Sequence, residues 1–485
     1  GRFAFIAGVL LTCPSALGSD RPAGPGRASD TASQSRDVFV LHAAHAASTP
    51  DWWTRLTVLN RGISITPVLI ELFDGTGVKL DSTTVPGLPI GGVYQADIDA
   101  IFAKSYAGSD LWLRISGSSE LCGAVEFGTR DGRTLSIVPL FDNPSTRIVF
   151  PYVYITPSTS ESYYTGITVL NPNDAVNEVT LRAYTEDGEL LAEHPESVPP
   201  GTKYVRLVDQ IFDGVPDPNA IRMIRVSASL PVLGFELFGK WNAFGVAGLP
   251  AVVESVETPA TKSPEFDKDG FVPVGDIFYN EIPDDDTWYT GMTVCNLTDQ
   301  PAQVLSLLFD GAGNTLREIT WELGPYQQFT REVWNFFGLA PTPAAATGRI
   351  KANSPISGFE LMLSRGNPFR FDGLEACDRV YRRLDFPVIQ CGADSTTRLH
   401  LSRLFTFPNP FTVTAYDANG NGLGNYTDTL GLAATLDLDL AAIFPGVADQ
   451  IAWIHVEAQD RVVGNVFLLS ADNERLGSYL GIGRN

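Results

Sequence analysis

Four copies of one pattern run along this 485-residue chain, and this repetition constrains the fold more than any other feature of the sequence. Each copy begins at a threonine, which is followed 19 residues later by Phe or Tyr and 23 residues later by Gly. The threonines are Thr54, Thr165, Thr290 and Thr397, and the glycines are Gly77, Gly188, Gly313 and Gly420. Such a chain is expected to fold as four similar units and not around one large core.

Apolar residues alternate with other residues inside the copies, and this alternation indicates β-strands. After the threonine, every second residue is apolar, as with Leu56 and Val58 in the first copy and Ile167 and Val169 in the second. The positions between them are mixed in polarity. One face turned inward and one turned outward is what a two-layer antiparallel sandwich requires.

Two further landmarks complete the unit. The glycine closes a hairpin turn, since such turns need a residue that tolerates a positive φ. A short amphipathic run then precedes a phenylalanine and indicates a single helical turn; these residues are Phe102, Phe212, Phe337 and Phe444. We therefore predict an all-β fold of four tandem antiparallel β-sandwich domains, each of immunoglobulin-like size and each with one short helical turn.

The predicted sandwiches cover residues 37–142, 147–253, 270–380 and 384–485. A linker rich in Pro, Thr and charged residues, 254–269, separates the second from the third. The connections differ in length, so we expect the four sandwiches to follow one another end to end in an unevenly bent array.

The N-terminal segment resembles a secretory signal peptide over residues 1–18. It has a basic Arg2, an apolar run at 3–11 and small residues before position 19. The run is too short to span a bilayer, and no later stretch is long enough. Residues 19–36 then form a flexible linker. We predict a secreted or cell-surface protein, with lipid attachment at Cys13 as the alternative.

The net charge of −22 bears on the partners of the chain. Phosphate contacts need clustered Lys and Arg, so nucleic acid is not an expected partner. An acidic exterior that keeps the protein in solution is the simpler interpretation. We expect partners at the cell surface or outside the cell, or other copies of the chain.

Four cysteines follow Cys13. Cys122 and Cys295 occupy strand positions that other copies fill with apolar residues, so they are expected to be buried. Cys377 and Cys391 flank the junction between the third and fourth copies, where a disulfide is predicted because exported proteins form disulfides.

Two acidic segments are candidates for calcium, the one cofactor that the sequence suggests. Asp417, Asn419 and Asn421, with Asp428 further on, match the spacing of a calcium-binding loop. The same positions in other copies are hairpin turns, which argues against the metal. The second segment is the run Asp284, Asp285 and Asp286.

Pairs of aromatic residues precede the first strand in three copies. Alternation buries one ring of each pair and exposes the other, so the exposed rings predict either a platform for glycans or caps on the ends of the sandwiches. The pairs are Trp52 with Trp53, Tyr163 with Tyr164, and Trp288 with Tyr289.

No catalytic residues are assigned. The sequence contains no nucleophile-elbow, phosphate-loop or zinc-protease motif. A basic residue precedes the last glycine of each copy, and in the first three copies it is predicted to pair across a hairpin with a glutamate, as Arg225 with Glu236 and Arg349 with Glu360. These pairs are interpreted as structural.

The motif Thr-Gly-Ile/Met-Thr-Val-Leu/Cys-Asn, the aromatic residue and glycine that follow, and the closing Gly-Phe-Glu-Leu together resemble tandem immunoglobulin-like β-sandwich repeats of secreted bacterial surface proteins. This resemblance implies an exported, elongated, non-enzymatic protein used for adhesion, surface display or an extracellular fibre. The alternatives are an array of glycan-binding modules and accessory domains of a secreted enzyme.

Overall fold

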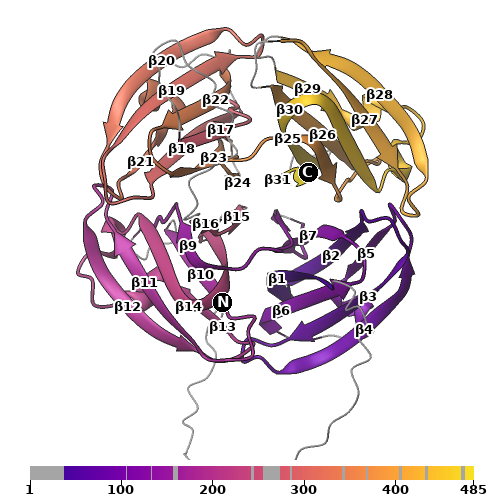
Figure 1. Ribbon diagram of the computed structural model, residues 1–485, viewed down its shortest axis with the longest axis horizontal. Coiled ribbons are helices and arrows are strands. Elements are labelled where there is room, and N and C mark those ends of the chain that lie inside the picture. The colour runs from indigo at the N-terminus through magenta and orange to yellow at the C-terminus, as the bar shows by residue number, and fades with distance from the viewer. Residues whose placement is uncertain are drawn as a thin grey trace, which may run out of the picture.

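The computed structural model describes residues 38–484 except 105, 107, 133, 157–161, 242–244, 255–273, 285–286, 341–344, 367–369, 404–406, 432–434 and 471–475. The fold is all-β, with 63% strand and 6% helix, and its strands form antiparallel sheets (Figure 1). The predicted signal peptide, Cys13, the flexible linker at 19–36 and residues 255–269 of the later linker lie outside the described residues.

The strands fall into four groups that follow one another along the chain. The first group comprises β1 (Phe39–Ser48), β2 (Trp52–Asn60), β3 (Thr66–Phe73), β4 (Lys79–Leu88), β5 (Val93–Asp97), β6 (Gly108–Gly117), β7 (Leu121–Thr129) and β8 (Leu135–Pro139). The second comprises β9 (Ser145–Phe150), β10 (Tyr163–Leu170), β11 (Asn177–Tyr184), β12 (Leu190–Val198), β13 (Lys203–Leu207), β14 (Met223–Lys240), β15 (Val246–Pro250) and β16 (Val252–Val253).

The other two groups repeat this order. The third comprises β17 (Gly275–Tyr279), β18 (Trp288–Asn296), β19 (Ala302–Asp310), β20 (Thr315–Leu323), β21 (Gln328–Glu332), β22 (Ala345–Ala352), β23 (Ile356–Ser364) and β24 (Phe371–Glu375). The fourth comprises β25 (Tyr381–Phe386), β26 (Ser395–Arg403), β27 (Asn409–Tyr416), β28 (Gly422–Leu430), β29 (Thr435–Asp439), β30 (Trp453–Ser470), β31 (Leu476–Leu480) and β32 (Ile482–Arg484).

Each group pairs its strands in the same way. In the first group one sheet has the order β1-β6-β3-β4 and the other β5-β2-β7-β8, and the third group repeats both orders. In the second and fourth groups a single strand of 18 residues, β14 or β30, belongs to both layers. The predicted helical turn is present in each group as α1 (Ile98–Ile101), α2 (Val208–Ile211), α3 (Val333–Phe337) and α4 (Leu440–Ile443). Two short 3-10 turns, Pro218–Ala220 and Ala448–Gln450, complete the set.

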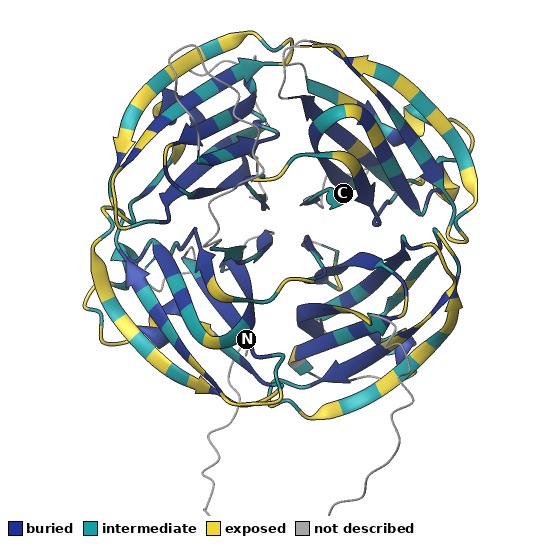
Figure 2. Ribbon diagram, viewed as in Figure 1, coloured by how far each residue is buried: buried dark blue, intermediate teal, exposed yellow. Residues whose placement is uncertain are grey.

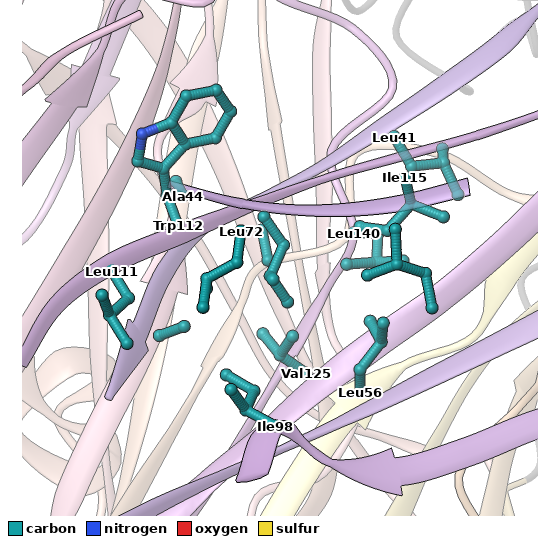
Figure 3. Packing of buried hydrophobic residues seen from close by; sticks show 14 of the residues in the cluster. Leu41, Ala44, Leu56, Leu72, Ile98, Leu111, Trp112, Ile115, Val125 and Leu140 are labelled. Carbon is teal, nitrogen blue, oxygen red and sulfur yellow. The ribbon is translucent and has the colours of Figure 1, made fainter. Parts of the chain in front are cut away.

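The core of each group lies between its two layers (Figure 2). In the first group Leu56 of β2 is fully buried against the opposite layer, to which Leu72 of β3 and Ile115 of β6, also fully buried, belong (Figure 3). The alternation of apolar residues therefore identified side chains that are buried in the structure. Burial of each such side chain stabilises the fold by about 1.5–3 kcal/mol.

The threonine that begins each copy fixes the preceding segment to the first long strand. The Thr54 hydroxyl bonds both the N–H and the carbonyl of Ala47 at 2.9 Å. Thr165 bonds Tyr154 in the same way, at 3.1 and 3.0 Å. Because one hydroxyl satisfies a backbone donor and a backbone acceptor, this position requires a hydroxyl group and not just a small side chain.

A buried asparagine at the end of the same strand holds the loops of the sandwich together. The Nδ2 group of Asn171 lies 2.8–3.0 Å from the carbonyl oxygens of Ala175, Val198 and Pro199. Asn60 and Asn296 have equivalent partners in the first and third groups. In the fourth group Arg403 occupies this position and donates to the carbonyls of Leu430 and Gly431.

The four groups form a closed ring (Figure 1). The inner strands β8, β15, β24 and β31 lie around its centre, and each contacts the next, including β31 with β8. The expectation of an elongated, end-to-end array is therefore wrong. The groups close into a ring because the outward face of the layer that contains β2 or β10 packs against the preceding group. Phe235 and Leu237 of β14, for example, join the core cluster of the first group.

One hydrogen bond recurs at all four contacts between groups. The first residue of β5, β13, β21 or β29 donates its backbone N–H to a carbonyl in the glycine turn of the preceding group. The four bonds are Lys203 to Gly75 (3.1 Å), Gln328 to Glu186 (3.0 Å), Thr435 to Gly311 (3.3 Å) and Val93 to Ala418 (2.9 Å). The last of them joins the fourth group to the first, so the ring closes with the same contact that builds it.

The glycine of each turn has a second role that follows from this contact. Gly77, Gly188, Gly313 and Gly420 have φ values of 83–84°, as the turn prediction requires. At Gly188 a Cβ atom would lie 2.0 Å from the Pro325 carbonyl oxygen, and at Gly420 it would lie 2.5 Å from the Ile90 carbonyl oxygen. The absence of a side chain therefore allows both the turn and the close approach of the next group.

The predicted pairing of basic residues with glutamates is wrong. Arg225 pairs with Glu254, and Arg349 pairs with Asp276 at 2.8 Å. Glu236 and Glu360 lie in the other layer of their groups and are fully buried there. The residues that were expected to face each other across a hairpin belong to different sheets.

Candidate functional site

The contact between the third and fourth groups has a polar interior. It gathers Asn280 and Glu281, which follow β17, with His400 on β26 and Asn465 on β30. His400 and Asn465 are opposite each other in the register, so both face the third group. The positions equivalent to Asn465 hold Phe235 and Phe359 in the second and third groups. The fourth group thus carries an amide where the second and third groups carry a phenyl ring, and His400 stands where the other groups carry threonine.

These side chains satisfy one another only in part. Asn280 Nδ2 donates to Asn465 Oδ1, and Glu281 Oε2 lies 3.5 Å from His400 Nδ1. Asn280 Oδ1, Asn465 Nδ2 and both ring nitrogens of His400 have no well-aligned hydrogen-bond partner among the described residues. Asn465 also bonds Glu281, and His400 bonds the backbone of Asn280, so the cluster is linked within itself.

Burial sets the charge state of this cluster. It lowers the pKa of His400 to about 4 and raises the pKa of Glu281 to about 8, with the negative charge of Asp437 adding to the second shift. At neutral pH both groups are therefore uncharged. The close approach of Glu281 to His400 is a contact between neutral groups and not an ion pair.

A small cleft lies beside the cluster. Its volume is about 30 Å³, which accommodates about two water molecules and is far smaller than an ordinary ligand pocket. It is lined by Phe278, Tyr279, Asn280, Phe309, Thr347, Gly348, Arg349, Ser402 and Arg403. The two arginines are held by other partners, Arg349 by Asp276 and Arg403 by backbone carbonyls. The cleft suits solvent between two groups and not a substrate.

Other buried ionisable groups are spread over the contacts around the ring. Glu126 accepts a hydrogen bond from Gln390 of the fourth group at 2.6 Å, and burial raises its pKa to about 7. Lys203 donates to the Leu111 carbonyl of the first group at 2.8 Å, and burial lowers its pKa to about 7. Within the described part of the chain, no three His, Cys, Asp or Glu residues form a group suited to a metal ion.

The calcium candidate at Asp417 has the geometry of a hairpin turn. Asp417 Oδ1 accepts from the backbone N–H groups of Asn419 and Asn421, and Oδ2 accepts from Asn421 Nδ2 at 2.8 Å. Asp310 makes the same bonds in the third group. Asp428 lies within β28 and bonds Tyr426.

The second acidic candidate is described only at its first residue. Asp284 is buried and accepts a hydrogen bond from Arg365 at 2.7 Å. Asp285 and Asp286 lie outside the described residues.

The four cysteines of the described residues are present as thiols. Cys122 and Cys295 are buried, as predicted. The predicted disulfide between Cys377 and Cys391 is not formed in this structure. Cys377 Sγ instead lies 2.7 Å from the Arg379 carbonyl oxygen, and Cys377 pairs with Phe278 of the third group.

All six residues of the aromatic pairs are half-buried. Trp53 donates to the Thr129 carbonyl and packs against the core of the fourth group, whereas Trp52 packs against the core of its own group. Tyr163 stacks on Phe238, with ring centres 5.5 Å apart. The remaining members, Tyr164, Trp288 and Tyr289, also pack against hydrophobic clusters. The pairs therefore lie at the contacts between groups.

No helix among the described residues is both long enough and apolar enough to cross a membrane.

Comparison with known proteins finds weak similarity. No family model and no curated protein matches the chain. A crystal structure of Thermotoga maritima 1070 aligns with 16% identity and a TM-score of 0.21, over 23% of this chain and 97% of the other. A tetra-tandem repeat from the extending region of a large adhesion protein aligns with 11% identity and a TM-score of 0.11, over 91% of this chain and 97% of the other. Glycoside Hydrolase family 32 from Bifidobacterium adolescentis aligns with 9% identity and a TM-score of 0.15, over 92% and 96%. All three similarities are weak, and these scores assign no function.

Proposed function

We propose that this chain is a non-enzymatic structural or adhesive protein of the cell surface. The observation that carries this proposal is the use made of the repeated residues. The threonine, the asparagine and the glycine shared by the copies hold loops, turns and contacts between groups, as Thr54, Asn171 and Gly420 do. A chain whose repeated residues stabilise its own fold is better suited to a structural role than to catalysis.

The location outside the cell rests on the signal-like segment at residues 1–18. We further propose that the four strand groups are separate immunoglobulin-like sandwich domains with the boundaries 37–142, 147–253, 270–380 and 384–485. Because the groups close into a ring, a fibre would have to form between copies of the chain and not by extension of one chain.

Surface proteolysis of intact cells tests the proposal. Cells that make the full chain should lose it on treatment with an added protease, and cells without the gene should attach to surfaces several-fold less well. Re-expression of the full chain should restore attachment, whereas a chain without residues 1–18 should not. A protein that stays protected until the cells are lysed would contradict the proposal.

A further inference from the structure

Among the described residues, the edge of the first strand group beside β1 is largely uncovered, whereas strands cover the equivalent edges of the second and fourth groups. In the second group β16 pairs antiparallel with β9, and in the fourth group β32 pairs antiparallel with β25. In the first group this cover shrinks to one pairing, His42 with Phe141. The chain therefore shows twice what this kind of edge accepts: a short antiparallel strand.

The backbone of β1 points hydrogen-bonding groups toward this edge. His42 donates to Phe141 at 2.9 Å and accepts from it at 2.8 Å on the open side of the strand. Successive residues of a strand point their N–H and carbonyl groups to opposite sides, so those of Val40 face the same side as those of His42. Within the described part of the chain, Val40 has no backbone partner there. A strand added at Val40 would continue the line that Phe141 begins.

The side chains at this edge are apolar and uncharged. Val38, Phe39 and Val40 are 63%, 41% and 36% exposed. At the position of Val40 the other groups carry a charged residue: Arg147, Asp276 and Arg383. Charged residues on an edge strand oppose pairing with other chains, and the first group lacks one at this position.

Two outer edge strands of the described chain carry charges. The outer strand β4 has Lys79 and Asp81, and β20 has Arg317 and Glu318. With a net charge of −22, two copies of this chain repel each other over most of their surface. A face on which they can meet must be uncharged, and the edge at residues 38–40 meets this condition.

We propose that the β1 edge binds the β1 edge of a second copy of the chain, so that two rings form a symmetric dimer. In an antiparallel register centred on Phe39, Val38 of each copy faces Val40 of the other, and no charge is placed opposite a like charge. Val38 and Val40 of the second copy then resemble Val252 and Val253 of β16, which are β-branched, apolar and extended. This inference deepens the proposed function, because joining rings by one edge leaves their remaining surfaces available.

Light scattering coupled to size exclusion, on the full chain over about a hundredfold range of concentration, tests the proposal. The wild-type chain should shift from the mass of one chain to that of two as its concentration rises. Val40→Arg should remain monomeric, and it should fold, because the second and fourth groups carry arginine at this position. Val40→Pro should also remain monomeric, since it removes the N–H that the partner strand would bind.

Leu69→Arg is the matched control. Leu69 lies on the same sheet face as Val40 but on β3, beyond β6, and so away from the edge. It should leave the dimer intact. A wild-type chain that is monomeric at every concentration would overturn the proposal, even if the edge binds some other segment. A dimer that survives Val40→Arg, or that Leu69→Arg also abolishes, would overturn the edge as its site. None of these results bears on surface location, which proteolysis of cells tests separately.

Discussion

The backbone N–H of Val93 donates a hydrogen bond to the carbonyl of Ala418 over 2.9 Å, across 325 residues of sequence. This bond joins the start of β5 in the first group to the glycine turn of the fourth. Trp453 reinforces it, since its indole N–H donates to the Gly91 carbonyl at 2.8 Å. Arg61 adds a bond to the Gly483 carbonyl at 3.0 Å. The last contact of the ring is therefore as well built as the three that precede it.

The closing contact should be sensitive to the size of residue 420. Gly420 and Gly446 share a φ of 84°, but of the two only Gly420 has neighbours within 4 Å of the place that an added Cβ atom would take, namely the backbone of Ile90 and Gly91. Gly446→Ala should cost about 1 kcal/mol of backbone strain. Gly420→Ala should cost that amount and about 1–3 kcal/mol more from the clash. Thermal unfolding of the two variants checks this, and equal midpoints would contradict the closed ring.

The buried asparagine should be among the most sensitive polar positions. Asn171→Ala leaves the carbonyls of Ala175, Val198 and Pro199 without their donor, so we expect a loss of about 2–4 kcal/mol in the free energy of unfolding. The exposed Asn425→Ala should change it by less than about 0.5 kcal/mol. Denaturant unfolding measures both, and a mild effect at Asn171 would show that solvent replaces the lost bonds.

Stability should fall as the pH rises, with Glu126 as one source. Burial raises its pKa to about 7, although Arg55 and the hydrogen bond from Gln390 act in the opposite direction. The folded state then holds this proton more tightly than the unfolded state does. The resulting stabilisation is complete below the ordinary range of glutamate and is lost as the pH rises through about 7, by about 3 kcal/mol in total.

Glu126→Gln isolates this effect, because glutamine does not titrate. Relative to the wild type, the variant should be more stable at about pH 8 than at about pH 5. The exposed Glu318→Gln should follow the wild type at both values. A wild-type and a Glu126→Gln profile that run parallel would show that Glu126 ionises freely in the folded protein.

The thiols of Cys377 and Cys391 should be recoverable without reduction. Burial raises the pKa of the Cys377 thiol, and its Sγ contacts the Arg379 carbonyl, so we expect slow alkylation in the folded protein and complete alkylation after unfolding. Peptide mapping of the unreduced chain checks this. A cross-linked pair of peptides containing both cysteines would contradict it.

Much of the local structure could be predicted from the sequence. The apolar alternation at Leu56 and Val58 correctly placed strands and their buried faces. The glycine of each copy correctly marked a turn with positive φ, and the run before Phe102 correctly indicated a helical turn. These features depend on neighbouring residues, so a single sequence contains the information for them.

The ring itself could not be predicted in this way. Thr57, Thr168 and Thr293 lie on the strand face that was expected to meet solvent, yet all three are buried. A strand face lined with threonine can lie against water or against a neighbouring group. Alternation shows only that the two faces of a strand differ in polarity. Phe235 and Phe359, on the adjoining strand of that layer, carried the missing signal, because two large rings at one repeated outward position indicate a partner.

The polar contact at His400 escaped prediction for a related reason. Asn280 and Glu281 follow β17, whereas His400 and Asn465 lie on β26 and β30, and no motif connects them. Comparing the repeated columns shows that Asn465 replaces a phenylalanine, but the identity of the residues opposite depends on how the groups pack. The arginine and glutamate pairs failed similarly, since Arg225 and Glu236 lie on one long strand that crosses from one sheet to the other.

Closure also fixes the copy number. A linear string of modules can gain or lose one member by recombination and leave its neighbours in place. A closed ring of four groups has no room for a fifth, because the contact between Val93 and Ala418 already joins the first group to the fourth. A gene that encoded five copies, or three, would have to open this circle and expose the surfaces that now meet at its rim.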